Sequence, residues 1–197
     1  MGRNIWVTSD THYNHEKILT FYDFRGNRTR SFDTVSQMNE FLLERWNSVV
    51  KPGDIVYHLG DVFFGNKATF EKDWPKFHGS KRLLPGNHDD VKYLSDTGFF
   101  KKIMYWRMFT EHGLLFHHIP LDVTSLFRGK DSSAPLFQAH GHTHTMGSPK
   151  RGPYTSVCVE LRDYTPVHIE DLAKEARHYR ENVWPSDKEL FESIGIL

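Results

Sequence analysis

The stretch SFDTVSQMNEFLLERWNSVVKPGDIVYHLGD, residues 31–61, predicts a helix, an abrupt end and a buried strand in direct succession. Its first part repeats apolar residues every three or four positions, as does a helix with one face on a core. The predicted buried stripe is Val35, Met38, Leu42, Trp46 and Val49. Ser31 or Asp33 can cap the start of this helix, since either side chain can accept a backbone N–H. The turn KPGD at 51–54 ends the helix, and the apolar run 55–59 then predicts a strand followed by Gly60-Asp61.

The segments on either side of this stretch repeat the alternation of strand and helix. A short β-prone run at 4–8 precedes it and ends in the polar residues SDTH. A weaker helix is predicted over about 66–77, with Pro75 disturbing its end. The run that begins at Lys81 predicts a strand that breaks at Pro85-Gly86. Strand, helix, strand, helix, strand is the order typical of an α/β domain.

The second half of the chain is richer in β-prone segments, which are short and separated by turn residues. These segments are 102–110, 113–119, 135–140, 155–161 and 166–169, with a hairpin turn expected at 111–113. A surface helix is expected from Ile169 to about Asn182. Together the two halves predict an α/β fold in which two stacked mixed β-sheets are flanked by helices, an α/β/β/α sandwich.

The overall composition narrows the class of protein. A chain of 197 residues suits one domain, here residues 1–197, and 25 basic against 25 acidic residues give no general field that would attract nucleic acid or a membrane. Cys158 is the only cysteine, so no disulfide can form within the chain. No apolar run is long enough to span a bilayer, and the start lacks the apolar core of a signal peptide. We therefore expect a cytoplasmic protein without a membrane partner.

Potential metal ligands follow the predicted strands. In QAHGHTHTMG, residues 138–147, histidines stand on alternate positions, and in an extended segment such side chains share a face. Further candidates follow four earlier strands: Asp10, His12, Asp61, Asn87, His88, His117 and His118. Each motif alone has an ordinary explanation, such as a capping aspartate, a Gly-Asp or Pro-Gly turn, a buried histidine or a histidine-rich surface loop. Because α/β sheets bind ligands at the carboxyl ends of their strands, the occurrence of these motifs after five strands predicts one shared metal site there.

The ordered motifs resemble those of the calcineurin-like metallophosphoesterase superfamily, especially its small single-domain bacterial and phage members. The matching residues are Asp10-Thr11-His12, Gly60-Asp61, Gly86-Asn87-His88-Asp89, His118 and Gly141-His142-Thr143-His144. His118 matches rather than His117, because HIP fits the His-x-Pro pattern of the family. The resemblance implies one metal position formed by Asp10, His12 and His144, a second formed by Asn87, His118 and His142, and Asp61 bridging them. Gly141 would let the backbone turn into the site, and His140 would stay in the strand.

The resemblance further implies a metal-dependent phosphoester hydrolase in which two divalent cations activate a hydroxide for in-line attack on phosphorus. His88 is the expected catalytic residue, which would stabilise charge on the phosphate or protonate the leaving oxygen. Asp89 would orient His88 or cap the following helix. A mixed nitrogen and oxygen ligand set favours Mn²⁺, with Fe, Zn²⁺ and Co²⁺ as alternatives. We expect a phosphodiesterase ahead of a phosphomonoesterase, acting on a small-molecule phosphoester or a nucleotide.

Residues near the first motif are candidates for substrate binding. His15 follows His12 closely, and Arg25, Arg28 and Arg30 lie in the basic segment FRGNRTR, residues 24–30. Arginine suits phosphate oxygens, although a solvated loop before the helix explains the same charges. An endonuclease or exonuclease acting on DNA or RNA is the alternative function, and a non-catalytic scaffold of the same fold is a third. The sequence leaves the oligomeric state open.

Overall fold

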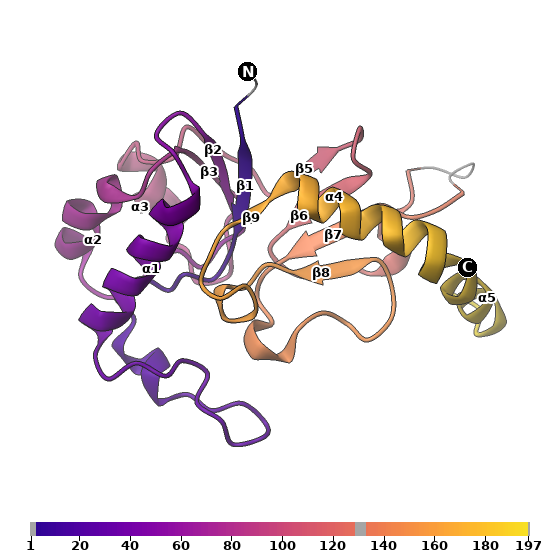
Figure 1. Ribbon diagram of the computed structural model, residues 1–197, viewed down its shortest axis with the longest axis horizontal. Helices are drawn as coiled ribbons and strands as arrows, with labels where there is room; N and C mark the ends of the chain where they lie inside the picture. The colour runs from indigo at the N-terminus through magenta and orange to yellow at the C-terminus, as the bar shows by residue number, and fades with distance from the viewer. Residues whose placement is uncertain (1–2, 129–132, 197) are drawn as a thin grey trace.

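The computed structural model describes residues 3–128 and 133–196 and contains two β-sheets (Figure 1). The first sheet has the strand order β4-β3-β2-β1-β9. Its strands are β1 (Ile5–Thr8), β2 (Ile55–His58), β3 (Ser80–Leu83), β4 (Lys102–Ile103) and β9 (Val167–His168). The pairs joining β1 to β4 are parallel, whereas β9 runs antiparallel to β1, so this sheet is mixed.

The second sheet has the strand order β5-β6-β7-β8. Its strands are β5 (Trp106–Phe109), β6 (Leu114–His117), β7 (Phe137–His140) and β8 (Tyr154–Ser156). The β5–β6 pair is the expected hairpin and is antiparallel, while β6, β7 and β8 are parallel. Both sheets are therefore mixed, as predicted.

Helices flank the sheets on two sides (Figure 1). Helices α1 (Val35–Val49), α2 (Lys67–Asp73) and α3 (Val91–Asp96) pack on the first sheet. Helix α4 (Ile169–His178), the π-helical turn η6 (Tyr179–Val183) and helix α5 (Trp184–Ser193) pack against the core that both sheets share. Among the described residues, five 3-10 segments lie in the connections: η1 (Glu16–Thr20), η2 (Trp74–Lys76), η3 (Val123–Leu126), η4 (His144–Met146) and η5 (Val159–Leu161).

The strands supply side chains to cores on both of their faces. On β2, Val56 packs under the helices, while Tyr57 packs between the sheets. On β6, Phe116 belongs to the core between the sheets, while Leu115 packs on the other face with Leu126 of η3. Since successive strand residues point to opposite faces, both faces of these strands are covered by apolar side chains, which leaves the ends of the strands for polar residues.

Helix α1 carries the predicted stripe but begins at a different cap. The fully buried members of the stripe are Met38, Leu42 and Trp46. Thr34, rather than Ser31 or Asp33, is the N-cap, and its hydroxyl accepts the Gln37 backbone N–H at 3.2 Å. The Gln37 side chain in turn accepts the Asp33 backbone N–H at 2.9 Å. Backbone N–H groups on both sides of the N-cap are thus hydrogen-bonded by side chains.

The C-terminal helical region is longer and less regular than predicted. We expected one helix ending near Asn182, but α4 ends at His178 and continues through η6 into α5, which ends at Ser193. Pro185 lies in the first turn of α5, directly after the π-helical turn η6, and the helical run continues through it. Within residues 3–128 and 133–196, no helix is long and apolar enough to cross a membrane.

Candidate metal centre

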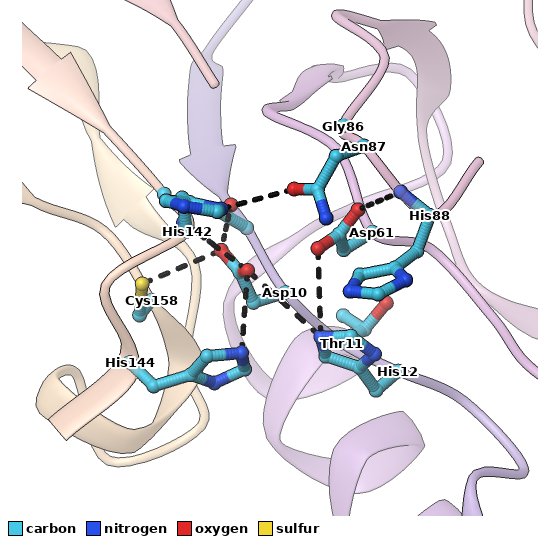
Figure 2. A network of polar contacts seen from close by, with 12 residues as sticks. Asp10, Thr11, His12, Asp61, Gly86, Asn87, His88, His142, His144 and Cys158 are labelled. Carbon is cyan, nitrogen blue, oxygen red and sulfur yellow. Dashed lines mark hydrogen bonds and ion pairs between the residues drawn. The ribbon is translucent and has the colours of Figure 1, made fainter. Parts of the chain in front are cut away.

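The predicted ligands converge at the carboxyl ends of the strands (Figure 2). Asp10 and His12 follow β1, Asp61 follows β2, and Asn87 follows β3. The histidines of the second sheet follow β6 and β7: His118, His142 and His144. Backbone bonds hold the loops together at this edge, including Asp10 N–H to Gly60 O at 2.9 Å and Gly141 N–H to His118 O at 2.8 Å.

Two groups of side chains could each hold one cation. Asp10, His12 and His144 form the first group, and Asp61, His118 and His142 form the second. In each group the potential ligand atoms lie within 4.8 Å of one another. Ligand atoms bound about 2.0–2.2 Å from one cation lie about 3–4 Å apart. Asp10 Oδ1 lies 3.9 Å from His12 Nε2 and 3.7 Å from His144 Nε2, and Asp61 Oδ2 lies 3.6 Å from His118 Nε2, so these separations suit a metal ion.

Asp61 lies between the two groups. Its Oδ2 is 3.7 Å from His12 Nε2 of the first group and 3.6 Å from His118 Nε2 of its own group. Asn87 adds an amide oxygen to the second group, because its Oδ1 lies 3.0 Å from His118 Nε2 and 2.9 Å from His142 Nδ1. The ligand atoms, which come from residues as far apart in the sequence as Asp10 and His144, thus form one cluster of nitrogen and oxygen atoms.

The chemistry of the buried donors fits a bound cation. His12 is 3% exposed, and neither of its ring nitrogens has a hydrogen-bond partner among the described residues. Burial lowers the pKa of His12 far below its ordinary value, so its imidazole is neutral, the form that binds metals. Burial raises the pKa of Asp10 against the opposing effect of His144. A cation would satisfy His12 and stabilise the ionised form of Asp10.

The backbone is strained at most of these ligands. Eight non-glycine residues among those described have a positive φ, and five belong to the cluster. These five are Asp10 (58°), His12 (43°), Asp61 (57°), His142 (69°) and His144 (45°). Side chains other than glycine enter this region at an energetic cost, and such strain persists where the surrounding structure imposes it. Its concentration here indicates that the fold is built to hold these side chains.

Glycines make room for the carboxylates. A Cβ at Gly141 would collide with Ser9 Oγ and Asp10 Oδ2, and one at Gly86 would collide with Asp61 Oδ1. Gly141 does not have a positive φ, so a left-handed backbone is not what requires glycine at this position. Its role is to admit the close approach of Asp10, whose Oδ2 accepts the His142 backbone N–H at 2.9 Å.

Asp89 connects two loops of the cluster, which corrects both expected roles. It neither caps the following helix nor hydrogen-bonds His88 among the described contacts. Its carboxylate accepts the backbone N–H groups of Asp61 at 2.9 Å, Gly86 at 2.8 Å and Val62 at 2.9 Å. The N-cap of α3 is instead Asp90. Asp89 therefore fixes the position of Asp61 relative to the loop after β3.

Arg30 lies inside the protein and not at the substrate rim, which corrects the prediction for this residue. It is 0% exposed, and its guanidinium donates to the backbone carbonyls of Asp10 and Thr11. Its Nε also donates to Glu160 Oε1 at 2.8 Å. Glu160 Oε1 lies 2.9 Å from His144 Nδ1 as well. The ion pair between Arg30 and Glu160 thus positions both the loop that follows β1 and the candidate ligand His144.

Sequence reasoning missed Glu160. We expected a strand over 155–161, but β8 ends at Ser156 and Glu160 lies in η5. A lone acidic residue in the apolar run SVCVEL was the available signal, and it does not identify a partner. A carboxylate on the second nitrogen of a ligating histidine fixes its tautomer and orientation, which is the geometry seen at His144.

The remaining histidines divide between the cluster and its surroundings. His118 joins the second group, whereas His117 contacts the backbone of Ile119. His140 is buried, as expected, with Nδ1 2.8 Å from Gly141 O. His15 stacks on Phe64 with ring centroids 4.1 Å apart. Cys158 is buried beside Asp10, and burial raises the pKa of its thiol.

His88 and the two exposed arginines lie outside the ligand groups. The His88 ring centroid is 5.9 Å from that of His12 and 5.1 Å from that of Phe64, so His88 borders the cluster from an exposed position. Arg25 and Arg28 are exposed on the segment 21–29, where Arg25 lies over the Phe24 ring at 5.1 Å.

Fold and site together define an α/β protein with a candidate metal centre on the carboxyl edge of two stacked sheets. The calcineurin-like phosphoesterase family matches residues 3–188, and the chain belongs to this family. It is therefore a metal-dependent phosphoester hydrolase, and the family implies divalent metal ions for which the structure has two candidate sites.

Similar proteins extend over most of the chain. An uncharacterized protein of Methanocaldococcus jannaschii is 31% identical over 185 residues, covering 87% of this chain and 90% of that protein. The gene 66 protein of Mycobacterium phage L5 is 27% identical and covers 72% of this chain and 78% of its own length. A crystal structure of a protein of unknown function from Aquifex aeolicus has a TM-score of 0.65 and 24% identity, covering 88% of this chain and 99% of that one. The last comparison supports the fold.

Proposed function

We propose that this protein hydrolyses phosphodiesters with two divalent cations bound side by side. Asp10, His12 and His144 would hold one cation, and Asn87, His118 and His142 the other. The observation that carries the proposal is the position of Asp61, whose Oδ2 is within 3.7 Å of a histidine from each group. Paired cations lower the pKa of a coordinated water and neutralise charge on the reacting phosphate.

His88 is the proposed catalytic residue. Its backbone N–H donates to Asp61 Oδ1 at 3.0 Å, which ties the residue to the shared ligand while its side chain borders the cluster. A neutral imidazole here can donate a hydrogen bond to a phosphate oxygen, and a protonated one can protonate the leaving oxygen. General acid catalysis of this kind typically contributes about 10²–10⁴-fold.

Space on two sides of the cluster supports a diester substrate. A cavity of about 280 Å³ is lined in part by His144, and another of about 560 Å³ is lined by His15 and Phe64. A phosphomonoester has one organic group, whereas a diester has two that need room. Half-buried His15 and exposed Lys17, which both line the second cavity, would contact the group on that side.

Mn²⁺ is the proposed metal for activity. Imidazole nitrogens suit Mn²⁺, Fe, Co²⁺ and Zn²⁺, and the carboxylate and amide oxygens of Asp10, Asp61 and Asn87 shift this mixed set toward Mn²⁺. All-oxygen sites of the kind preferred by Mg²⁺ and Ca²⁺ differ from this donor set.

Hydrolysis assays with matched variants test the proposal. The protein is treated with chelator, reloaded with Mn²⁺, and assayed on bis(p-nitrophenyl) phosphate and p-nitrophenyl phosphate, with metal content measured by elemental analysis. We expect faster cleavage of the diester, two cations per chain, and loss of both activity and one or more cations in Asp61→Ala. Asp171→Ala removes a carboxylate that is 56% exposed in a surface ion pair and serves as the control.

Two results would contradict the proposal. Failure to cleave either ester with any of the four metals would remove the assigned activity. Equal metal content and equal rates in Asp61→Ala and the wild type would show that Asp61 does not join two cations.

A further inference from the structure

The cavity beside His144 has walls that the proposed hydrolysis does not explain. One wall is the segment 21–29, and the other is the segment 143–146 around η4. Apart from buried Ile18, the apolar side chains that line it are unusually exposed. They are Phe21 (48%), Tyr22 (61%), Phe24 (76%) and Met146 (71%). Exposed apolar side chains gathered beside a catalytic centre mark a binding surface rather than a core.

The segment 21–29 is an ordered hairpin. Tyr22 and Arg28 form an antiparallel bridge, and the Thr29 N–H donates to Phe21 O at 2.9 Å. Asp23 Oδ1 accepts the backbone N–H groups of Arg25 and Asn27, each at 2.9 Å. These bonds order the backbone that carries the aromatic rings, so little backbone entropy is lost when a ligand binds. Figure 1 shows this hairpin extending from the main body below the 3-10 helix that follows β1.

The lining suits a flat heteroaromatic ring. Aromatic rings and a methionine offer faces for stacking, and the hydroxyl-bearing residues Thr29, Thr143 and Thr145 also line the cavity. At about 280 Å³ the cavity is at the small end for ligand pockets, which admits a ring system and not a long acyl chain. Asp23 also lines the cavity, and its negative charge is outnumbered by the exposed Arg25 and Arg28, which lie on the same hairpin but do not line the cavity.

We propose that this cavity binds the base of a nucleoside phosphoester and sets its phosphorus at the metal centre beside His144. The inference rests on the proposed function, because it names the substrate class for the same site. Every nucleobase has a face that stacks on aromatic side chains, so the cavity would accept nucleosides with little preference among bases.

A pair of esters that differ only in the base tests the inference. Thymidine 5′-(p-nitrophenyl phosphate) and the same ester of 1,2-dideoxyribose share the leaving group and the sugar. We expect kcat/KM for the thymidine ester to exceed that for the base-free ester by about 5- to 150-fold, which is the effect of stacking one base on aromatic side chains. Titration of the metal-free protein with thymidine 5′-phosphate and deoxyribose 5-phosphate measures the same preference without turnover.

Variants of the hairpin identify the surface responsible. Tyr22→Ala/Phe24→Ala should reduce the preference for the base to near unity, and Tyr22→Leu/Phe24→Leu should reduce it nearly as much, since leucine keeps apolar area but has no aromatic face. Both positions are exposed, so the fold should tolerate these changes. Ile194→Ala, at a residue 58% exposed beyond α5, is the control and should leave the preference unchanged.

The outcomes separate this inference from the proposed function. Equal cleavage of both esters by the wild type would overturn the base pocket while leaving the hydrolase intact. An undiminished preference for the thymidine ester in Tyr22→Leu/Phe24→Leu would also overturn the base pocket, because aliphatic side chains would then be enough to produce the preference. If neither ester is cleaved, the proposed function fails, and the titration alone decides whether the cavity binds a base.

A third experiment distinguishes a mononucleotide substrate from a nucleic-acid strand as the source of the bound base. A single-stranded trinucleotide with the same p-nitrophenyl ester is compared with the thymidine ester at two salt concentrations. A higher and salt-dependent kcat/KM would support a base pocket that serves a nucleic-acid strand. Equal values would support a base pocket that serves a mononucleotide.

Discussion

Replacing Glu160 by glutamine tests whether a buried ion pair supports both the fold and the metal centre. The Glu160 side chain is 2% exposed and lies 2.9 Å from His144 Nδ1 and 2.8 Å from Arg30 Nε. Burial alone would raise the pKa of the Glu160 carboxyl, but Arg30 and His144 together outweigh it and lower the pKa to about 2. The carboxylate is therefore ionised at neutral pH. Glutamine keeps its shape and removes its charge.

The expected cost follows from the burial of Arg30. Removing one partner of a buried ion pair costs about 3–5 kcal/mol, because the other charge is left without compensation. For a chain of 197 residues each kcal/mol lowers Tm by about 2–4 °C, so the metal-free Glu160→Gln protein should melt about 6–20 °C lower. His144 also loses the anion that orients its ring, which should weaken Mn²⁺ binding about 10–100-fold.

Urea unfolding with chelator and calorimetric titration with Mn²⁺ measure the two effects separately. Glu175→Gln is the matched control, because its ion pair with Arg162 is partly exposed and should be worth less than about 1 kcal/mol. The pair Arg30→Met/Glu160→Leu should recover much of the stability, since no charge stays unpaired, but not the Mn²⁺ affinity. If Glu160→Gln matches the wild type in both measurements, the ion pair has neither role.

Three further changes have defined outcomes. His88→Gln should slow cleavage of a dialkyl phosphate about 10²–10⁴-fold and of bis(p-nitrophenyl) phosphate much less, because p-nitrophenoxide leaves without a proton; equal losses would contradict a general acid. Gly141→Ala should lower kcat about 100-fold, because the added Cβ would displace Asp10. Gly53→Ala is the control and should leave kcat unchanged, since its Cβ would meet open space. Equal kcat values in the two variants would refute the steric role of Gly141. Burial lowers the pKa of Lys81 to about 8 from its ordinary 10.5. Between pH 8 and 10.5 Lys81 therefore keeps its proton in the unfolded chain and loses it in the folded protein, so the free energy of unfolding of the wild type should rise with pH over this window. In urea unfolding, Lys81→Met should exceed the wild type in free energy of unfolding by up to about 3 kcal/mol at neutral pH, and this difference should shrink as the pH rises through the window. A difference that does not depend on pH would contradict the prediction.

The sequence predicted the candidate metal ligands better than the buried residues that hold those ligands in place. Ligands such as His142 immediately follow a strand, so the strand pattern places them at the carboxyl edge of a sheet before any tertiary contact is known. Arg30 and Glu160 are 130 positions apart, and no periodicity relates them. Arg30 lies in a basic segment with Arg25 and Arg28, and only tertiary burial separates it from those two exposed residues. The left-handed backbone at the ligands likewise depends on the assembled loops.

The same ion pair joins the metal centre to the walls of the proposed base pocket. Arg30 directly follows Thr29 at the end of the hairpin, and its guanidinium is fixed on the carbonyls of Asp10 and Thr11. Glu160 connects Arg30 to His144, which is the first residue of η4 and part of the opposite wall.

The two walls therefore have one buried anchor, and a change at Glu160 should loosen both. We expect Glu160→Gln, at saturating Mn²⁺, to lose part of its preference for the thymidine ester over the base-free ester. The control Glu175→Gln should retain that preference, because its partner Arg162 is not among the residues that line the pocket. An unchanged preference in Glu160→Gln alongside weaker Mn²⁺ binding would refute the coupling, because the hairpin would then be positioned independently of the metal ligands.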